Sequence, residues 1–309
     1  MLMNGVLIID KPSGLTSHDV VNRVRRILQQ SAVGHLGTLD PLATGLLPLV
    51  TGNLTRLAQF YTSSEKTYEG TIRFGFATDT YDSDGAPVSV GPTVNVLLED
   101  VRGLAARFVG VFNQMPPPFS AKKIRGVPAY KLARKHQDIV LKAVQVEIKE
   151  LEILGLEGDT ASFRARVASG TYMRSVAHDM GQQVGCGAHL ASLRRTALAE
   201  FGLSEAHTLE EVSATAQSGR NEAIEAMFVH PRRLLPHFPC VTASDEVAAH
   251  VRSGRAVNLP ELSQAKLVKV FAGQRELIAI ATRIAGTLFH PKIVLTAASP
   301  VQAAKGTPR

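Results

Sequence analysis

The 309-residue sequence has no tryptophan, only two cysteines and no long apolar run. Two cysteines, Cys186 and Cys240, are too few for a disulfide framework or a four-ligand zinc site. No stretch approaches the roughly eighteen apolar residues that a membrane-spanning helix needs, so we expect no transmembrane segment. The N-terminus holds no lysine or arginine before its short apolar run and does not match a signal peptide. These absences favour a reduced, cytoplasmic protein.

The composition is that of an ordinary globular protein, with 45% hydrophobic and 20% charged residues. A chain of 309 residues is too long for one small module and fits two domains. Periodicity predicts strands in the first 230 residues at 6–9, 67–76, 144–148 and 163–167, and helices near 17–28, 54–61, 98–108 and 176–184. The Pro-rich stretch 231–239 marks a domain boundary, followed by short strands at 267–271, 277–281 and 293–296.

Basic residues gather in two parts of the chain. The net charge is 34 − 27 = +7, yet residues 1–229 hold 23 basic and 23 acidic residues, against 11 and 4 from residue 230 onward. A second basic segment lies between Asp100 and Asp138, with eight lysines and arginines and no acidic residue. Such clusters serve either solubility or a polyanionic partner. Nucleic acid is favoured over a membrane because neither cluster lies on a strongly amphipathic helix.

Asp40 is the candidate catalytic carboxylate. It lies in the glycine-rich stretch 34–45 (GHLGTLDPLATG), and no other carboxylate occurs between Asp19 and Glu65. An Asp-Pro pair often only initiates a turn, but a lone carboxylate in a loop can also serve as a nucleophile or base. The glycines at 34, 37 and 45 are expected to let the backbone approach a ligand closely. A phosphate-binding loop is disfavoured because no Gly-Lys pair follows the stretch.

Three further residues are candidates from their local setting. His35 precedes the Asp40 turn, but no other histidine stands at metal-ligand spacing from it, which argues against a metal site. Tyr172 and Arg174 lie in a strand-to-helix turn, where a tyrosine could stack on a base and an arginine could pair with an anion. The Asp79–Gly85 stretch lacks the spacing of a calcium loop and indicates a polar turn.

Several stretches, in order, resemble one enzyme family. They are 6–17 (VLIIDKPSGLTS), 34–45, 65–69 (EKTYE), 117–122 (PPFSAK), 130–134 (YKLAR) and 170–175 (GTYMRS). On these motifs, residues 4–200 resemble the bacterial TruB-type tRNA pseudouridine synthases. The last 70 or so residues are similar to the PUA-type RNA-binding domain of that family.

The resemblance implies an enzyme that converts uridine 55 in the T loop of tRNA to pseudouridine, with no cofactor. Asp40 matches the family's catalytic aspartate, Arg174 would pair with it, and His35 would help displace the flipped nucleotide. Tyr68 would stack on the target base, Tyr172 and Leu193 would line its pocket, and Lys11 would support the site. The RNA-contacting basic residues of an inserted loop at about 112–140 would be Lys122, Lys123, Arg125, Lys131 and Arg134.

The resemblance also implies the fold and the partners. We expect an α+β catalytic domain over residues 1–232, with a mixed, mainly antiparallel central sheet flanked by helices and an active-site cleft. A small β-barrel-like, PUA-like domain would occupy residues 233–305. The expected partner is the T-arm stem-loop of tRNA, with no metal, no membrane and no obligate protein partner, and the protein would be a monomer.

This reaction suits the residue types, since a base inside an RNA loop must be extruded before its glycosidic bond can be broken. Whether Asp40 attacks the sugar or the base stays open. Two other functions also stay open: an RNA-binding protein whose Asp40 loop is vestigial, and a nucleotide-phosphate enzyme that uses the glycine-rich stretch.

Overall fold

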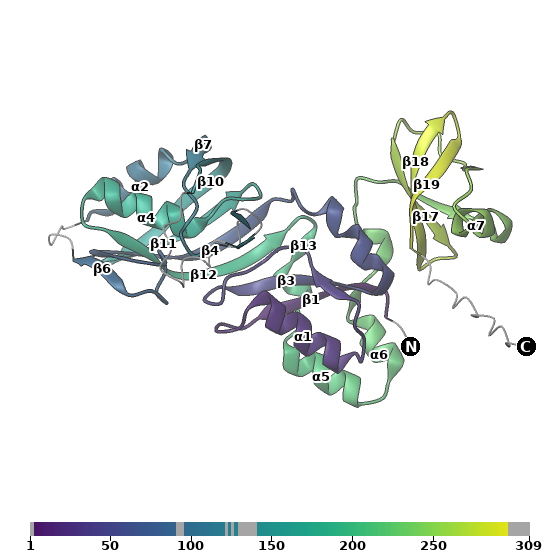
Figure 1. The fold of residues 1–309 in the computed structure, drawn as a ribbon, viewed down its shortest axis with the longest axis horizontal. Helices are drawn as coiled ribbons and strands as arrows, with labels where there is room; N and C mark the ends of the chain where they lie inside the picture. Colours follow the sequence, from purple (N-terminus) through teal and green to yellow (C-terminus); the bar gives the residue numbers. More distant parts are fainter. Residues whose placement is uncertain (1–2, 91–95, 121–122, 125–126, 129–140, 296–309) are drawn as a thin grey trace, which may run out of the picture.

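A ten-stranded sheet forms the body of the protein, and a five-stranded sheet follows it near the C-terminus (Figure 1). The computed structural model describes residues 3–90, 96–120, 123–124, 127–128 and 141–295. In the large sheet the strand order is β14-β1-β3-β12-β4-β11-β10-β7, with β2 beside β3 and β13 beside β12. Every pairing in it is antiparallel except β3 with β12. The mixed, mainly antiparallel sheet predicted from the sequence is therefore confirmed.

The strands of the large sheet are β1 (Gly5–Lys11), β2 (Val33–His35), β3 (Thr44–Thr51), β4 (Lys66–Phe74), β7 (Gly110–Gln114), β10 (Val144–Glu157), β11 (Thr160–Val167), β12 (Ala188–Leu198), β13 (Phe201–Gly202) and β14 (Phe228–Val229). Two short hairpins pair β5 (Phe76–Thr78) with β6 (Pro87–Val90) and β8 (Lys123–Ile124) with β9 (Val127–Pro128). The helices of this part are α1 (Ser17–Ile27), α2 (Leu98–Ala106), α4 (Met173–Val184), α5 (Leu209–Gln217) and α6 (Asn221–Ala226), with the 3₁₀ helices η1 (Gly52–Phe60) and η2 (Leu203–Glu205). None of these described helices, nor the one that follows, is long and apolar enough to span a bilayer.

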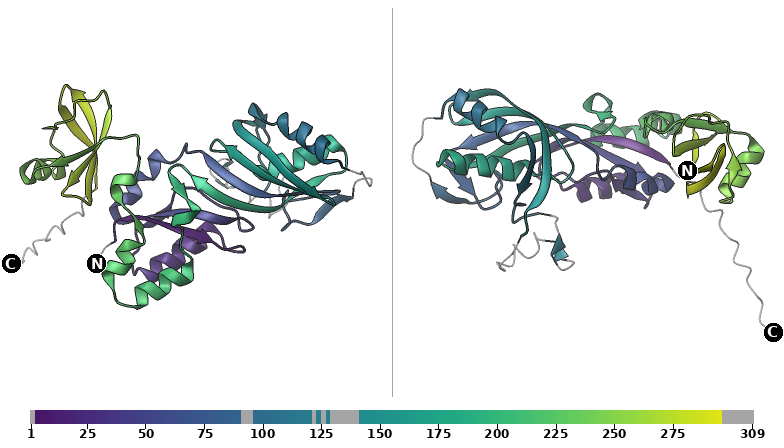
Figure 2. Two further views of the ribbon diagram at one scale, coloured as in Figure 1. Left: turned by 180° about the vertical axis from the view of Figure 1, so that it is seen from behind. Right: turned by 90° about the horizontal axis from the view of Figure 1, so that it is seen from above.

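β1 is covered on both faces, which explains its uninterrupted apolar run. Leu7 and Ile9 belong to the same buried cluster as apolar residues of α1 and α5, whereas Val6 and Ile8 belong to a second cluster on the opposite face. The alternation places consecutive residues on opposite faces of the sheet. Figure 2 shows α2 and α4 beside one end of the long sheet, with α1 and α5 beside the other.

Helix α1 begins where the sequence predicts. Thr16 caps it by accepting a hydrogen bond from the Asp19 backbone N–H, and the Asp19 carboxylate accepts from the Thr16 N–H in return. This capping box satisfies backbone donors that the first turn leaves unpaired. The first residue of the helix, Ser17, is thereby held against the Asp40 loop.

Some predicted elements differ from those observed. The strand expected over 67–76 ends at Phe74, because Gly75 has a φ of +105° that breaks the extended run. The 54–61 helix is the 3₁₀ helix η1, and the last strand covers 288–294 rather than 293–296. β3 and β12 were not predicted, although they form the parallel centre of the sheet.

The five-stranded sheet curls into a half-barrel with strand order β15-β17-β18-β19-β16. Its elements are η3 (Pro231–Arg233), β15 (Cys240–Ala243), α7 (Asp245–Arg252), β16 (Val257–Asn258), β17 (Leu267–Ala272), β18 (Glu276–Ala285) and β19 (Leu288–Val294). The small β-barrel-like unit predicted from the sequence is present, although residues 296–305 of its expected range lie outside the described residues.

One hydrophobic cluster joins the two sheets, and we call it the junction cluster. Its buried members are Val6, Ile8, Leu36, Leu46, Val50, Leu54, Leu57, Tyr61, Leu198, Phe201, Val229, Leu234, Leu235, Phe271, Leu277, Ile280, Ile293 and Leu295. Lys269 on β17 is also buried and donates hydrogen bonds to the carbonyls of Arg232 and Leu234 in the connecting segment. The C-terminal sheet therefore shares one buried apolar cluster with the connecting segment, η1 and the large sheet rather than being only tethered by the chain.

Phe271→Ala should test this shared packing. Removing a fully buried phenylalanine from a core costs about 3–5 kcal/mol, and the junction cluster would spread that loss over both sheets. Denaturant unfolding, followed by circular dichroism, is expected to show one transition shifted as a whole. Leu262→Ala is the control, since Leu262 is 88% exposed. An early transition confined to the C-terminal sheet would contradict the shared core.

Candidate active site

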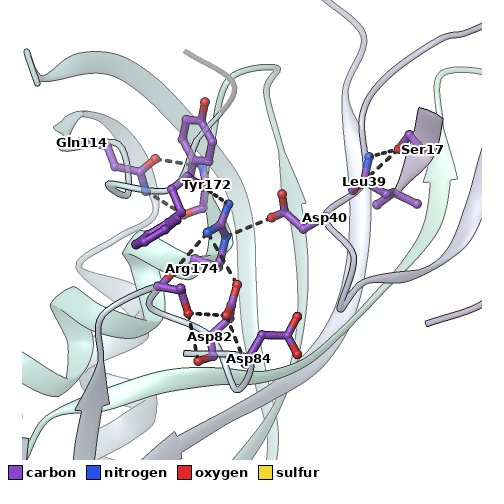
Figure 3. Close-up of polar contacts among 10 residues, drawn as sticks. Ser17, Leu39, Asp40, Asp82, Asp84, Gln114, Tyr172 and Arg174 are labelled. Carbon is purple, nitrogen blue, oxygen red and sulfur yellow. Dashed lines mark hydrogen bonds and ion pairs between the residues drawn. The ribbon is translucent and has the colours of Figure 1, made fainter. Parts of the chain in front are cut away.

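Asp40 lies in the loop between β2 and β3, and buried contacts on both sides fix that loop. The Ser17 hydroxyl accepts a hydrogen bond from the Leu39 N–H (2.8 Å) and donates to the Leu39 carbonyl (3.0 Å). Both residues are buried, and Figure 3 shows them beside the aspartate. The Ala43 N–H closes the turn on the Asp40 carbonyl at 3.1 Å. The aspartate backbone is therefore held on a rigid loop.

Two buried cations hold the same loop through its carbonyls. The Lys11 ammonium donates to the carbonyls of Pro12 (2.8 Å) and Pro41 (3.2 Å). Arg195 on β12 donates to the carbonyls of Gly37, Thr38 and Leu46 at 2.8–3.3 Å. Within the described chain Arg195 has no ion pair with a carboxylate, so its buried charge is satisfied by these oxygens and by the Tyr68 hydroxyl. The loop is thus bound from β1 and from β12.

Gly45 is required by the sheet rather than by a ligand. Its φ is +95°, and a Cβ there would lie 2.3 Å from the Arg195 carbonyl on the parallel neighbour β12. The close approach of β12 therefore explains this glycine without a ligand. Gly34 has ordinary backbone angles, and its hypothetical Cβ would only touch Val50.

Arg174 brings two carboxylates together at the start of α4 (Figure 3). Its Nε lies 2.9 Å from Asp40 Oδ2, and its Nη1 lies 3.5 Å from Asp82 Oδ2. The Arg174 and Asp82 side chains are only 6% and 7% exposed, whereas that of Asp40 is 37% exposed. Nη1 and Nη2 also donate to the carbonyls of Thr80 and Phe119. Asp40 is therefore the accessible carboxylate. The buried ion pair between Arg174 and Asp82 fixes the guanidinium with which Asp40 pairs.

Asp82 was not predicted as a site residue. The sequence indicates only a polar turn at this position. The Asp82 carboxylate accepts hydrogen bonds within that turn from the Thr80 hydroxyl and the Asp84 N–H. Burial raises the pKa of its carboxyl, against the hydrogen bond from Thr80 and the Arg174 charge. Its spacing in the sequence gave no signal for the Arg174 contact, because the two residues lie 92 positions apart.

The two tyrosines predicted for the site lie near Asp40. Tyr68 on β4 is 7% exposed and stands opposite Arg195 on β12, while half-buried Tyr172 is the N-cap residue of α4. Burial raises the pKa of both phenols, and the Asp40 charge adds to that effect. Leu193 on β12 is almost fully buried and packs in the same cluster as Tyr68. The Asp40 carboxylate is therefore close enough to both phenols to affect their pKa.

His35 and Lys11 flank the loop. His35 ends β2, and its Nδ1 accepts a hydrogen bond from the Gly37 N–H. Burial, followed by the Arg195 charge, lowers the pKa of the imidazole, which is therefore neutral at pH 7. Lys11 is fully buried, which lowers the pKa of its ammonium to about 8 despite the Asp40 charge. Both residues face the loop that bears Asp40.

The basic-loop residues cannot be placed. Lys122, Arg125, Lys131 and Arg134 lie outside the described residues. Lys123 lies in the β8–β9 hairpin, and its side chain is outside the described part. No group of three or more potential metal ligands occurs among the residues that are described.

Lys11 predicts a pH dependence of stability. Its native pKa of about 8 lies below the unfolded value of 10.5, so between these two values the unfolded chain binds more protons. Stability should therefore rise from pH 8 to pH 10, by roughly 1–2 kcal/mol. Urea unfolding at several pH values measures this rise in the free energy of unfolding. Lys11→Met should reduce the rise without removing it, because burial also lowers the pKa of Lys66 to about 8. Lys292→Met, at an exposed lysine, should keep the full rise, and a full rise in Lys11→Met would contradict the assignment.

Comparison with known proteins identifies the family. Residues 25–173 match the TruB family pseudouridylate synthase N-terminal domain, and residues 174–236 match the tRNA pseudouridylate synthase B C-terminal domain. The tRNA pseudouridine synthase B of Solibacter usitatus (strain Ellin6076) is 48% identical over 296 residues, which cover 95% of this chain and 100% of that protein. The chain belongs to the TruB family. It is a pseudouridine synthase, as the motifs predict.

Further relatives agree with this assignment to the TruB family. The tRNA pseudouridine synthase B of Azoarcus sp. (strain BH72) is 38% identical over 295 residues, 96% of each chain. Among solved structures, a crystal structure of a Cbf5-Nop10-Gar1 complex aligns with a TM-score of 0.68 at 26% identity, covering 92% of this chain and 79% of that one. The archaeal box H/ACA sRNP Nop10-Cbf5 complex gives 0.69 at 25%, covering 96% and 87%. The α+β fold is thus shared with these proteins.

Proposed function

We propose that the protein isomerises uridine 55 in the T loop of tRNA to pseudouridine, with Asp40 as the catalytic carboxylate. The observation that carries this proposal is the accessible Asp40 carboxylate, which pairs with the buried Arg174 guanidinium. Tyr172 is the N-cap residue of the helix that bears Arg174, and Tyr68 lies opposite Arg195, which binds the Asp40 loop. The names of the relatives in the TruB family support tRNA as the substrate.

The reaction needs no redox partner. The bond between ribose C1′ and uracil N1 breaks, the base turns, and C1′ bonds to C5. C5 then releases its proton to water, and N1 takes up a proton in exchange, so that the product is an isomer of the substrate. The Asp40 carboxylate must be ionised to attack or to accept a proton, and it pairs with the Arg174 guanidinium. Whether it attacks C1′ or the uracil ring is left open in this proposal.

The surrounding residues hold the extruded nucleotide. Tyr68 stacks on the uracil, with Tyr172 and Leu193 along the pocket wall, because an extruded base is bound by aromatic and apolar side chains. Neutral His35 helps displace the nucleotide from the RNA, and Lys11 acts by holding the Asp40 loop.

RNA affinity would come from basic residues outside this centre. We assign it to the basic loop at 112–140 and to a PUA-like domain over residues 233–305, on a catalytic domain of residues 1–232. Contacts to phosphates supply affinity that weakens with salt, while the folded T loop supplies selectivity. The proposed protein works in the cytoplasm as a monomer without a cofactor.

Mapping of the product tests the function. An unmodified tRNA transcript incubated with the enzyme should yield pseudouridine at position 55 alone, detected by carbodiimide modification and primer extension. A transcript with cytidine at that position should yield none. Pseudouridine at another position would overturn the site specificity, and binding without any product would favour an RNA-binding protein.

A further inference from the structure

Gln114 stands where the chain leaves the large sheet beside the active site. It is the last residue of β7 and pairs with Val144, the first residue of β10. Its side chain is almost completely buried, at 1% exposure. A buried amide must find hydrogen-bond partners, and those of Gln114 lie on the catalytic helix.

The amide of Gln114 pairs with the backbone of Tyr172 in both directions (Figure 3). The Tyr172 N–H donates to Gln114 Oε1 at 2.9 Å, and Gln114 Nε2 donates to the Tyr172 carbonyl at 3.0 Å. Tyr172 is the N-cap residue of α4, and its own side chain makes no capping hydrogen bond. Gln114 therefore fixes both backbone groups of the residue from which the helix starts.

The segment after Gln114 is bound to the same helical turn. The Ser175 hydroxyl donates to the Met115 carbonyl at 2.7 Å, and Arg174 Nη2 donates to the Phe119 carbonyl at 3.0 Å. The guanidinium that donates to the Phe119 carbonyl is the one that pairs with Asp40. The start of the segment and the first turn of α4 thus form one hydrogen-bonded unit.

We propose that Gln114 is a positioning residue for the reaction. By holding the Tyr172 backbone, it orients the first turn of α4, so that the Tyr172 ring and the Arg174 guanidinium keep their places around Asp40. It touches neither the substrate nor the reacting atoms. This inference rests on the proposed function, and it adds a residue that none of the motifs contains.

Gln114→Met gives the first test. Methionine has a similar length but leaves both backbone groups of Tyr172 without their partner. The single-turnover rate at saturating enzyme should fall 10- to 100-fold, while the tRNA Kd stays within threefold. Asn113→Met, at an exposed position of the same strand, should leave both values unchanged. A wild-type rate in Gln114→Met, or an equal loss of rate and binding, would overturn the proposal.

Gln114→Glu adds a readout that simple packing would not produce. An ionised glutamate accepts from the Tyr172 N–H but opposes the Tyr172 carbonyl, whereas a protonated glutamate can donate to it. Because burial raises a carboxyl pKa, the variant should approach the wild-type rate as the pH falls from 8 to 5.5. A ratio of wild-type to variant rate that stays constant over this pH range would overturn the proposal. This test does not depend on whether Gln114→Met folds. Failure of the proposed function itself would appear separately, as a wild-type protein that forms no pseudouridine.

Discussion

Asp40→Asn is expected to abolish pseudouridine formation while tRNA binding stays within a few-fold of the wild type. Asparagine keeps the size of the side chain but can neither attack nor accept a proton in the same way. Loss of a proton-transfer role alone costs about 10²–10⁴ in rate, and loss of a nucleophile costs more. Binding should persist because phosphate contacts elsewhere supply most of the affinity. Single-turnover assays and filter binding measure the two quantities separately.

A matched carboxylate serves as the control for Asp40. Asp159→Asn removes a surface partner of Arg73, with both side chains about half exposed, and such pairs contribute about 0–1 kcal/mol. This variant should retain both activity and binding. Full activity in Asp40→Asn would contradict the role of that carboxylate.

Arg174→Met should remove activity and also destabilise the fold. Arg174 and Asp82 form an ion pair with both side chains almost fully buried, so the substitution leaves the Asp82 carboxylate without its partner. Breaking one side of a buried pair costs about 3–5 kcal/mol. Denaturant unfolding measures the loss, and Arg194→Met, which breaks the more exposed pair with Asp10, should cost about 0–1 kcal/mol.

The loss of unfolding free energy in Arg174→Met should be smaller at low pH than at high pH. Burial already raises the pKa of Asp82 above its unfolded value, and removing the cation raises it further. A raised carboxyl pKa favours the native state when the group is protonated, so the deficit should shrink as the pH falls through that pKa. A deficit that is equal at pH 8 and pH 5 would contradict the assignment to Asp82.

Local patterns in the sequence predict those helices and strands whose formation depends mainly on neighbouring residues. The capping box of α1 and the alternation in β4 and β11 each follow from neighbouring residues. β12 could not be predicted this way, because its sequence AHLASLRRTAL is rich in good helix formers. It becomes a strand because β3 and β4 pair with it from both sides, which is a tertiary effect.

Prediction of the active-site residues from the sequence has the same limit. Asp40 can be predicted because it is a lone carboxylate in a distinctive loop, and its family resemblance supplies Arg174 as a partner. The sequence gives no usable signal for Asp82, Arg195 and Gln114, since each acts through contacts across a long sequence separation. A buried arginine without a carboxylate partner looks, in the sequence, like any surface arginine.

Tritium release tests the central claim most directly. Unmodified tRNA that carries tritium at C5 of its uridines should lose about one equivalent per molecule to water when incubated with the wild-type protein, since isomerisation replaces the C5 proton. The same RNA should lose none with Asp40→Asn. Well-folded wild-type protein that binds this tRNA but releases no tritium would contradict the account.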